Sequence, residues 1–80
     1  MKILKFYSET CGPCKVLDNN LKKAGIDYEA VNVTSDDDRI NKYHIRAIPT
    51  LIKEDNDKEI DRFTGIMNEE QLKTWCNVVE

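Results

Sequence analysis

Residues 2–14 read KILKFYSETCGPC, and this stretch decides the fold. Residues 3–7 are apolar apart from Lys5, which is typical of a central β-strand. Pro13 then fits the first turn of a helix, where no backbone donor is needed. Cys11 and Cys14 therefore lie at a junction between a strand and a helix. Two thiols separated by two residues can close into a disulfide and open again.

The composition is that of one small domain, which we expect to span residues 1–80. Hydrophobic residues make up 40% and charged residues 34% of the chain, as in ordinary soluble proteins. The net charge of −3, without a basic cluster, argues against nucleic acid and membranes as partners. No export signal is recognisable, so the cytoplasm is the expected location, where structural disulfides rarely persist.

Hydrophobic periodicity along the rest of the chain predicts an α/β protein with the order β-α-β-α-β-β-α. The predicted strands are 2–7, 28–33, 50–53 and 59–63. The first predicted helix is 13–24. A short second helix is capped by Ser35 or Asp36 and ends near Tyr43, and the last helix is capped by Asn68 together with Gln71. A β-α-β unit implies parallel strands, and the hairpin about Asp55-Asn56-Asp57 adds antiparallel ones. The expected architecture is a four-stranded mixed sheet flanked by helices.

The position of the two cysteines gives them different roles. The thiolate is the reactive form of cysteine, and the positive end of a helix stabilises it. Cys11 lies at that end and is expected to attack a substrate disulfide. Cys14 lies one turn further in and is expected to resolve the mixed disulfide by attacking Cys11.

Two other interpretations of the cysteine pair are weaker. A structural zinc site needs four ligands, and the chain offers only Cys76 and His44 in addition, both remote. A purely structural disulfide would close a tiny loop and constrain little chain. We therefore expect no metal. Cys76 is expected to be a buried core residue on the last helix.

Three motifs resemble the thioredoxin family. The tetrad Cys11-Gly12-Pro13-Cys14 is similar to the active-site tetrad of that family, and residues 43–50, YHIRAIPT, are similar to the segment around its cis-proline. Residues 63–66, FTGI, with the helix that follows, are similar to its glycine-containing bend and last helix. The motifs occur in the same order and cover almost all of the chain. The small size is similar to that of glutaredoxins and of short thioredoxins from phages and some prokaryotes.

The resemblance implies the thioredoxin fold and a cis Ile48–Pro49 bond beside the dithiol, whose backbone would pair with a substrate strand. From the residues alone, Pro49 could instead begin the next strand as a trans residue. Substrate binding is expected from Thr10, Ala47, Ile48, Pro49 and Gly65. Gly12 and Pro13 are expected to support the loop.

Some positions depart from the family pattern. Its tryptophan before the tetrad is replaced by Thr10. Its buried aspartate, thought to relay a proton to the second cysteine, is replaced by Lys5, and the lysine partner by Ala30, so we expect this ion pair to be missing. We expect Lys5 to extend to the surface; near the dithiol it would favour a thiolate. Proton transfer to Cys14 would then rely on water or Glu9.

The resemblance implies a protein-disulfide reductase without a bound cofactor. A thioredoxin reductase would recharge it, so NADPH would be used indirectly, and proteins such as ribonucleotide reductase would receive the electrons. The alternative is a glutaredoxin-type protein recharged by glutathione, which the size favours but the residues around the tetrad and Gly65 do not. A third possibility is a docking module without enzymatic activity. We expect a monomer.

Overall fold

The structure is a computed structural model that describes residues 2–35 and 38–77, and their elements follow the predicted order. The strands are β1 (Lys2–Tyr7), β2 (Glu29–Asn32), β3 (Thr50–Asp55) and β4 (Lys58–Thr64), and the helices are α1 (Gly12–Lys23), α2 (Asp38–Lys42) and α3 (Glu69–Asn77). No helix in the described part of the chain is long and apolar enough to cross a bilayer.

The four strands form one mixed sheet in the order β2-β1-β3-β4. β1 pairs with β2 in parallel, and β3 is antiparallel to both β1 and β4. Phe6, near the end of β1, lies opposite Thr50, the first residue of β3. The loop that follows β1 and the segment that precedes β3 therefore meet at the same end of the sheet.

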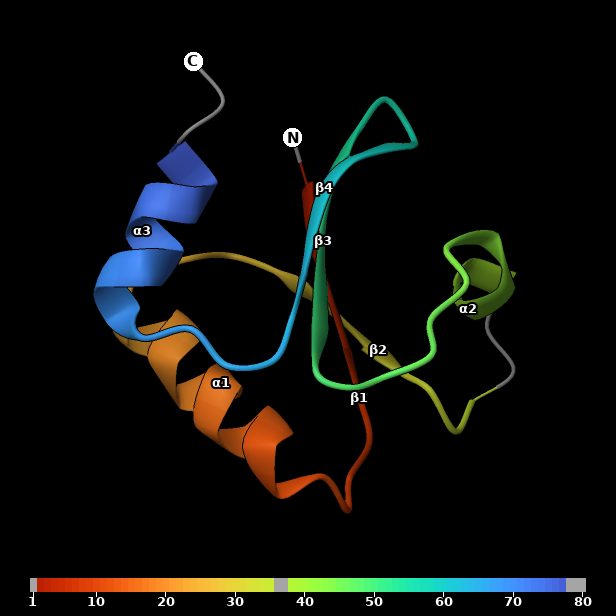
Figure 1. The fold of residues 1–80 in the computed structure, drawn as a ribbon, viewed down its shortest axis with the longest axis horizontal. Helices are drawn as coiled ribbons and strands as arrows, with labels where there is room; N and C mark the ends of the chain where they lie inside the picture. The colour runs from red at the N-terminus through yellow and green to blue at the C-terminus, as the bar shows by residue number, and fades with distance from the viewer. Residues whose placement is uncertain (1, 36–37, 78–80) are drawn as a thin grey trace.

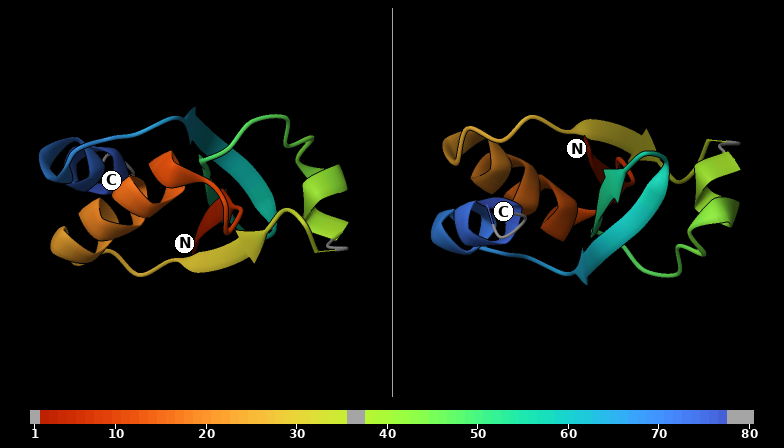
Figure 2. Two further views of the ribbon diagram at one scale, coloured as in Figure 1. Left: turned by 90° about the horizontal axis from the view of Figure 1, so that it is seen from below. Right: turned by 90° about the horizontal axis from the view of Figure 1, so that it is seen from above.

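The helices cover both faces of this sheet. α1 and α3 lie together on one face and α2 lies on the other, as Figures 1 and 2 show. Each face has its own buried cluster. The cluster under α1 and α3 contains Ile3, Leu17, Leu21, Leu51, Met67 and Leu72, and the cluster on the side of α2 contains Leu4, Phe6, Val31, Tyr43 and Ile52. The dithiol helix thus packs by one apolar stripe on the central strands.

The ends of the elements follow local chemistry. α1 has Cys11 as its N-cap, and Gly25 follows the helix with a φ of +70°, which suits glycine. At the start of α3, the Asn68 side chain accepts from the Gln71 backbone N–H at 2.8 Å, and the Gln71 side chain accepts from the Asn68 N–H at 3.0 Å. This reciprocal cap is the one predicted.

The hairpin is tighter than predicted. Asp55 belongs to β3 and pairs with Lys58 of β4, so the turn contains only Asn56 and Asp57. Both turn residues have positive φ, 52° and 65°, which suits a two-residue hairpin turn. α2 ends at Lys42, one residue before the predicted end near Tyr43, and the predicted cap at Asp36 lies outside the described residues.

Candidate active site

Cys11 and Cys14 form a disulfide at the N-terminal end of α1, with their Cα atoms 5.3 Å apart. The backbone N–H of Cys14 donates a hydrogen bond to the Cys11 Sγ atom at 3.1 Å. The N–H of Cys11 donates to the Ser8 carbonyl at 3.2 Å, which holds the loop to the end of β1. After reduction, the Cys14 N–H and the positive end of the helix would stabilise a negative Cys11 sulfur.

The two cysteines differ in exposure. Cys14 is 1% exposed and belongs to the core, whereas Cys11 is partly exposed at the edge of the helix. Gly12 and Pro13 between them are exposed. The disulfide of another protein can therefore approach the sulfur of Cys11 but not that of Cys14, which is the asymmetry expected from the sequence.

The segment before β3 carries the second predicted motif. The Ile48–Pro49 bond is cis, as the resemblance implied. It lies at the sheet end where the dithiol loop begins, because Thr50 pairs opposite the end of β1. The Thr50 hydroxyl, in a residue only 2% exposed, donates to the Ala47 carbonyl at 2.6 Å and fixes this turn.

The bend after β4 lies beside the cis bond. The Gly65 N–H donates to the Pro49 carbonyl at 2.9 Å, which joins two segments that the sequence separates by sixteen positions. Gly65 has a φ of +115°, where residues with a Cβ atom are strained. The next residue, Ile66, is 44% exposed. The structure thus brings together the predicted cis-proline and glycine motifs.

A shallow groove runs along the same segment. It has a volume of about 260 Å³ and is lined by Val33, Ile45, Arg46, Ala47 and Ile48. Ala47 is exposed and Ile48 is half-buried, so another molecule can reach both. Thr10 is also exposed, with its hydroxyl 3.4 Å from that of Ser8. Their role in substrate binding stays a prediction.

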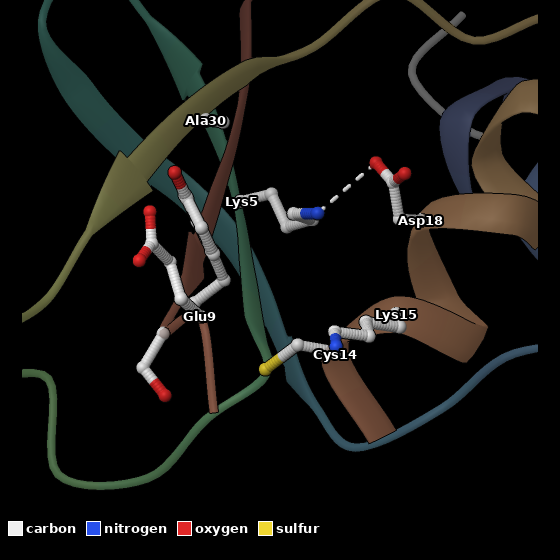
Figure 3. Close-up of a pocket in the computed structure, with 8 residues that line it drawn as sticks. Lys5, Glu9, Cys14, Lys15, Asp18 and Ala30 are labelled. Atoms are coloured by element: carbon white, nitrogen blue, oxygen red, sulfur yellow. Dashed lines mark hydrogen bonds and ion pairs between the residues drawn. The ribbon is translucent and has the colours of Figure 1, made fainter. Parts of the chain in front are cut away.

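A larger cavity of about 490 Å³ lies beside Cys14. Its lining residues come from β1, the loop after it, α1 and β2, and they are Lys5, Tyr7, Ser8, Glu9, Cys14, Lys15, Asp18 and Ala30. Figure 3 shows the side chains of Lys5 and Asp18 pointing toward each other from the strand and the helix. Glu9, the predicted alternative for proton transfer, lines the same cavity and is exposed.

The prediction that Lys5 extends to the surface is wrong. Its side chain is only 6% exposed, and its Nζ atom lies 3.1 Å from Asp18 Oδ1. The same ammonium lies 4.9 Å from the ring centroid of Tyr7 and 5.2 Å from that of Tyr28. A carboxylate and two aromatic faces therefore replace the water that the ammonium loses on burial.

Asp18 is the site residue that the sequence analysis missed. Ala30 lies next to Lys5 on the neighbouring strand, but the buried ion pair forms instead with a residue of α1. Asp18 also accepts from Lys22, whose Nζ lies 3.1 Å from Oδ2. Burial works to raise the pKa of Asp18, but the hydrogen bonds and charges of Lys5 and Lys22 outweigh it, so the pKa is lowered. A signal was present, because Asp18 follows Cys14 by one helical turn.

The third cysteine is separate from this site. Cys76 of α3 is half-buried and packs against the cluster under α1 and α3, and burial raises the pKa of its thiol. Within residues 2–35 and 38–77, no three His, Cys, Asp or Glu side chains are grouped as metal ligands would be.

Comparison with known proteins gives consistent matches. The sequence model of the Thioredoxin family matches residues 1–78. The chain is 29% identical over 79 residues to the mitochondrial thioredoxin of Bos taurus, covering 91% of this chain and 48% of that one. It is also 29% identical over 66 residues to the SPbeta prophage-derived thioredoxin-like protein YosR of Bacillus subtilis, covering 81% and 82%. The chain thus spans about half the length of the mitochondrial relatives.

The solved structures agree with the sequence matches. The thioredoxin of Fasciola hepatica superposes with a TM-score of 0.77 at 26% identity, covering 98% of this chain and 79% of that one. The four-stranded sheet and its three helices are therefore shared with solved thioredoxin structures.

Proposed function

Because the chain belongs to the thioredoxin family, we propose that it is a thiol-disulfide oxidoreductase that reduces protein disulfides through Cys11 and Cys14. The observation that carries this proposal is the disulfide at the start of α1, with one accessible and one buried sulfur. A structural disulfide would gain nothing from this asymmetry. A two-step exchange requires it.

In the first step, the Cys11 thiolate attacks one sulfur of the substrate disulfide. A bond forms between Cys11 and that sulfur, the substrate S–S bond breaks, and the other substrate sulfur leaves as a thiolate that takes a proton. The Cys14 N–H, 3.1 Å from Cys11 Sγ, stabilises the attacking charge. The substrate backbone would lie along the groove beside Ile48, where an extended strand could pair with the backbone of the cis-proline segment.

In the second step, Cys14 loses its proton and attacks the Cys11 sulfur. The Cys11–Cys14 bond forms, the bond from Cys11 to the substrate breaks, and the second substrate thiol is released. The substrate has gained two electrons and the protein has been oxidised to its disulfide. In the disulfide that this step forms, the two Cα atoms are 5.3 Å apart, within the usual range for such a bond.

The disulfide must then be reduced again. We propose that a thioredoxin reductase supplies these electrons from NADPH, that the protein itself binds no cofactor, and that it works in the cytoplasm as a monomer. Disulfide-containing enzymes such as ribonucleotide reductase are the proposed substrates. The intact Cys-Gly-Pro-Cys tetrad and the Ile48–Pro49–Thr50 segment support this choice over recharging by glutathione.

Reduction of insulin with dithiothreitol tests the activity. The wild-type chain is expected to accelerate precipitation of the insulin B chain, Cys11→Ser to abolish the acceleration, and Cys14→Ser to accumulate a mixed disulfide with substrate. A Cys76→Ser control is expected to behave as wild type. A wild-type rate equal to background would refute the proposal. Parallel assays with NADPH and either thioredoxin reductase or glutathione with its reductase decide how the protein is recharged.

A further inference from the structure

The cavity beside Cys14 is lined by the buried ammonium group of Lys5, which has no role in the two-step exchange as described above. The charged or titratable groups around the cavity, element by element, are Lys5 and Tyr7 of β1, Glu9 of the following loop, and Lys15 and Asp18 of α1. β2 contributes only Ala30. Glu9 and Lys15 are exposed, so water screens their charges, whereas the Lys5 side chain is 6% exposed.

We propose that Lys5, held in place by Asp18, is a positioning residue that favours the thiolate form of Cys14 in the second step of exchange. The inference rests on the proposed function, because only a dithiol exchange needs that thiolate. A buried positive charge lining the same cavity as a buried thiol stabilises the ionised sulfur. Lys5 undergoes no bond change itself.

The carboxylate of Asp18 does not cancel this effect. Lys22 also binds this carboxylate, at 3.1 Å, but the Lys22 side chain is 68% exposed, so water screens its charge. Asp18 is also more exposed than Lys5, at 25% against 6%, so its charge is more strongly screened. The role of Asp18 is to fix the ammonium of Lys5 beside the cavity.

The Cys14 thiol releases its proton to water in the cavity, and the thiolate attacks the Cys11 sulfur. The Cys11–Cys14 bond forms as the bond to the substrate breaks, and the leaving substrate thiolate takes up a proton. Asp18 is not the acceptor of the Cys14 proton, because two ammonium partners keep it in its ionised form.

Titration of Cys14 in the reduced full-length chain tests the inference. Lys5→Gln removes the charge but keeps a side chain that can donate to Asp18. Lys22→Gln is the matched control, because Lys22 binds the same carboxylate at the same distance but is 68% exposed and lies outside the cavity lining. The readout is the NMR chemical shift of the Cys14 Cβ carbon as a function of pH.

Lys5→Gln is expected to raise the pKa of Cys14, lowering its thiolate fraction at neutral pH about tenfold, and Lys22→Gln less than about twofold. A loss of at least about threefold in Lys5→Gln that exceeds the control supports the inference, and any smaller or equal loss overturns it. If Lys5→Gln fails to fold by circular dichroism, Asp18→Asn replaces it. That variant must raise the thiolate fraction.

The test also separates the inference from the proposed function. The pKa of Cys14 is measured without substrate or reductase, so a shift in pKa stands even if the protein fails to reduce insulin. Failure to reduce insulin would refute the proposed function. Normal insulin reduction with no shift in Lys5→Gln would refute only the role of Lys5.

Discussion

Tyr43→Phe is expected to lower the free energy of unfolding by about 1.5 to 3 kcal/mol at neutral pH. The Tyr43 hydroxyl donates a hydrogen bond to the carboxylate of Glu54, and the two residues are 4% and 8% exposed. The substitution keeps the ring and its edge-to-face contact with Phe6, at 6.3 Å between centroids. Only the donor to a buried carboxylate is removed. Losing a hydrogen bond to a charged group costs about 1.5 to 3 kcal/mol.

The pKa of Tyr43 makes this stabilisation depend on pH. Burial, followed by the hydrogen bond and the negative charge of Glu54, raises the pKa of Tyr43 from 10.0 to about 12. The folded protein therefore holds the phenol proton more tightly than the unfolded chain does. The resulting stabilisation is complete below pH 10 and is lost as the pH rises toward 12. A pKa difference of about two corresponds to roughly 3 kcal/mol of pH-dependent stability, and the hydrogen bond accounts for only part of it because burial is the largest cause of the shift.

Urea denaturation followed by circular dichroism measures both effects on the oxidised protein. The difference in unfolding free energy between wild type and Tyr43→Phe should shrink toward zero between about pH 10 and pH 12. Tyr28→Phe is the control, because the Tyr28 hydroxyl makes no hydrogen bond with any described residue, and its cost should stay within about 0.5 kcal/mol. A Tyr43→Phe cost below about 1 kcal/mol at neutral pH, or one that is constant through the alkaline range, would refute the reasoning.

Two further predictions concern the site and the third cysteine. Thr50→Val removes the donor to the Ala47 carbonyl, so it should cost about 1 to 2 kcal/mol of stability and raise the KM for insulin more than it lowers kcat. Thr64→Val is the control, because it loses only the longer 3.2 Å contact between hydroxyls, and both of its effects should be smaller. In the reduced protein, iodoacetamide should label Cys11 well before Cys76, whose pKa burial raises, and peptide mapping that shows equal labelling would contradict this.

Much of the fold could be predicted because each element has a strong local pattern. The apolar run of β1, the capping pair of α3 and the polar turn of the hairpin all depend on neighbours within a few residues. The errors lie at boundaries, where pairing across space decides. Asp55 resembles a turn residue in sequence, but its pairing with Lys58 draws it into β3. Such pairing is not visible in a local window.

The site divides in the same way. The dithiol is a short motif that its residue types indicate, whereas the cis bond before Pro49 is implied by the resemblance of residues 43–50 to a family segment. The Lys5–Asp18 pair is not a motif, because its two members are thirteen positions apart on different elements. The sequence did contain one indication, because Lys5 is a charged residue within the otherwise apolar part of β1. An isolated lysine in a strand can extend to the surface, and only the packing of α1 on β1 shows that a carboxylate is within reach.

The position of the charges determines the electrostatic field at the Cys14 sulfur. In the family pattern the strand carries a carboxylate, which disfavours a nearby thiolate. Here the strand carries the ammonium of Lys5 and the helix carries the carboxylate of Asp18. The more buried member of a pair lies in the lower effective dielectric, so its field dominates inside the cavity. A cation in that place stabilises the ionised dithiol relative to the disulfide. The reversal therefore predicts a protein that resolves its mixed disulfide readily and is a weaker reductant than its Lys5→Gln variant wherever Cys14 is ionised.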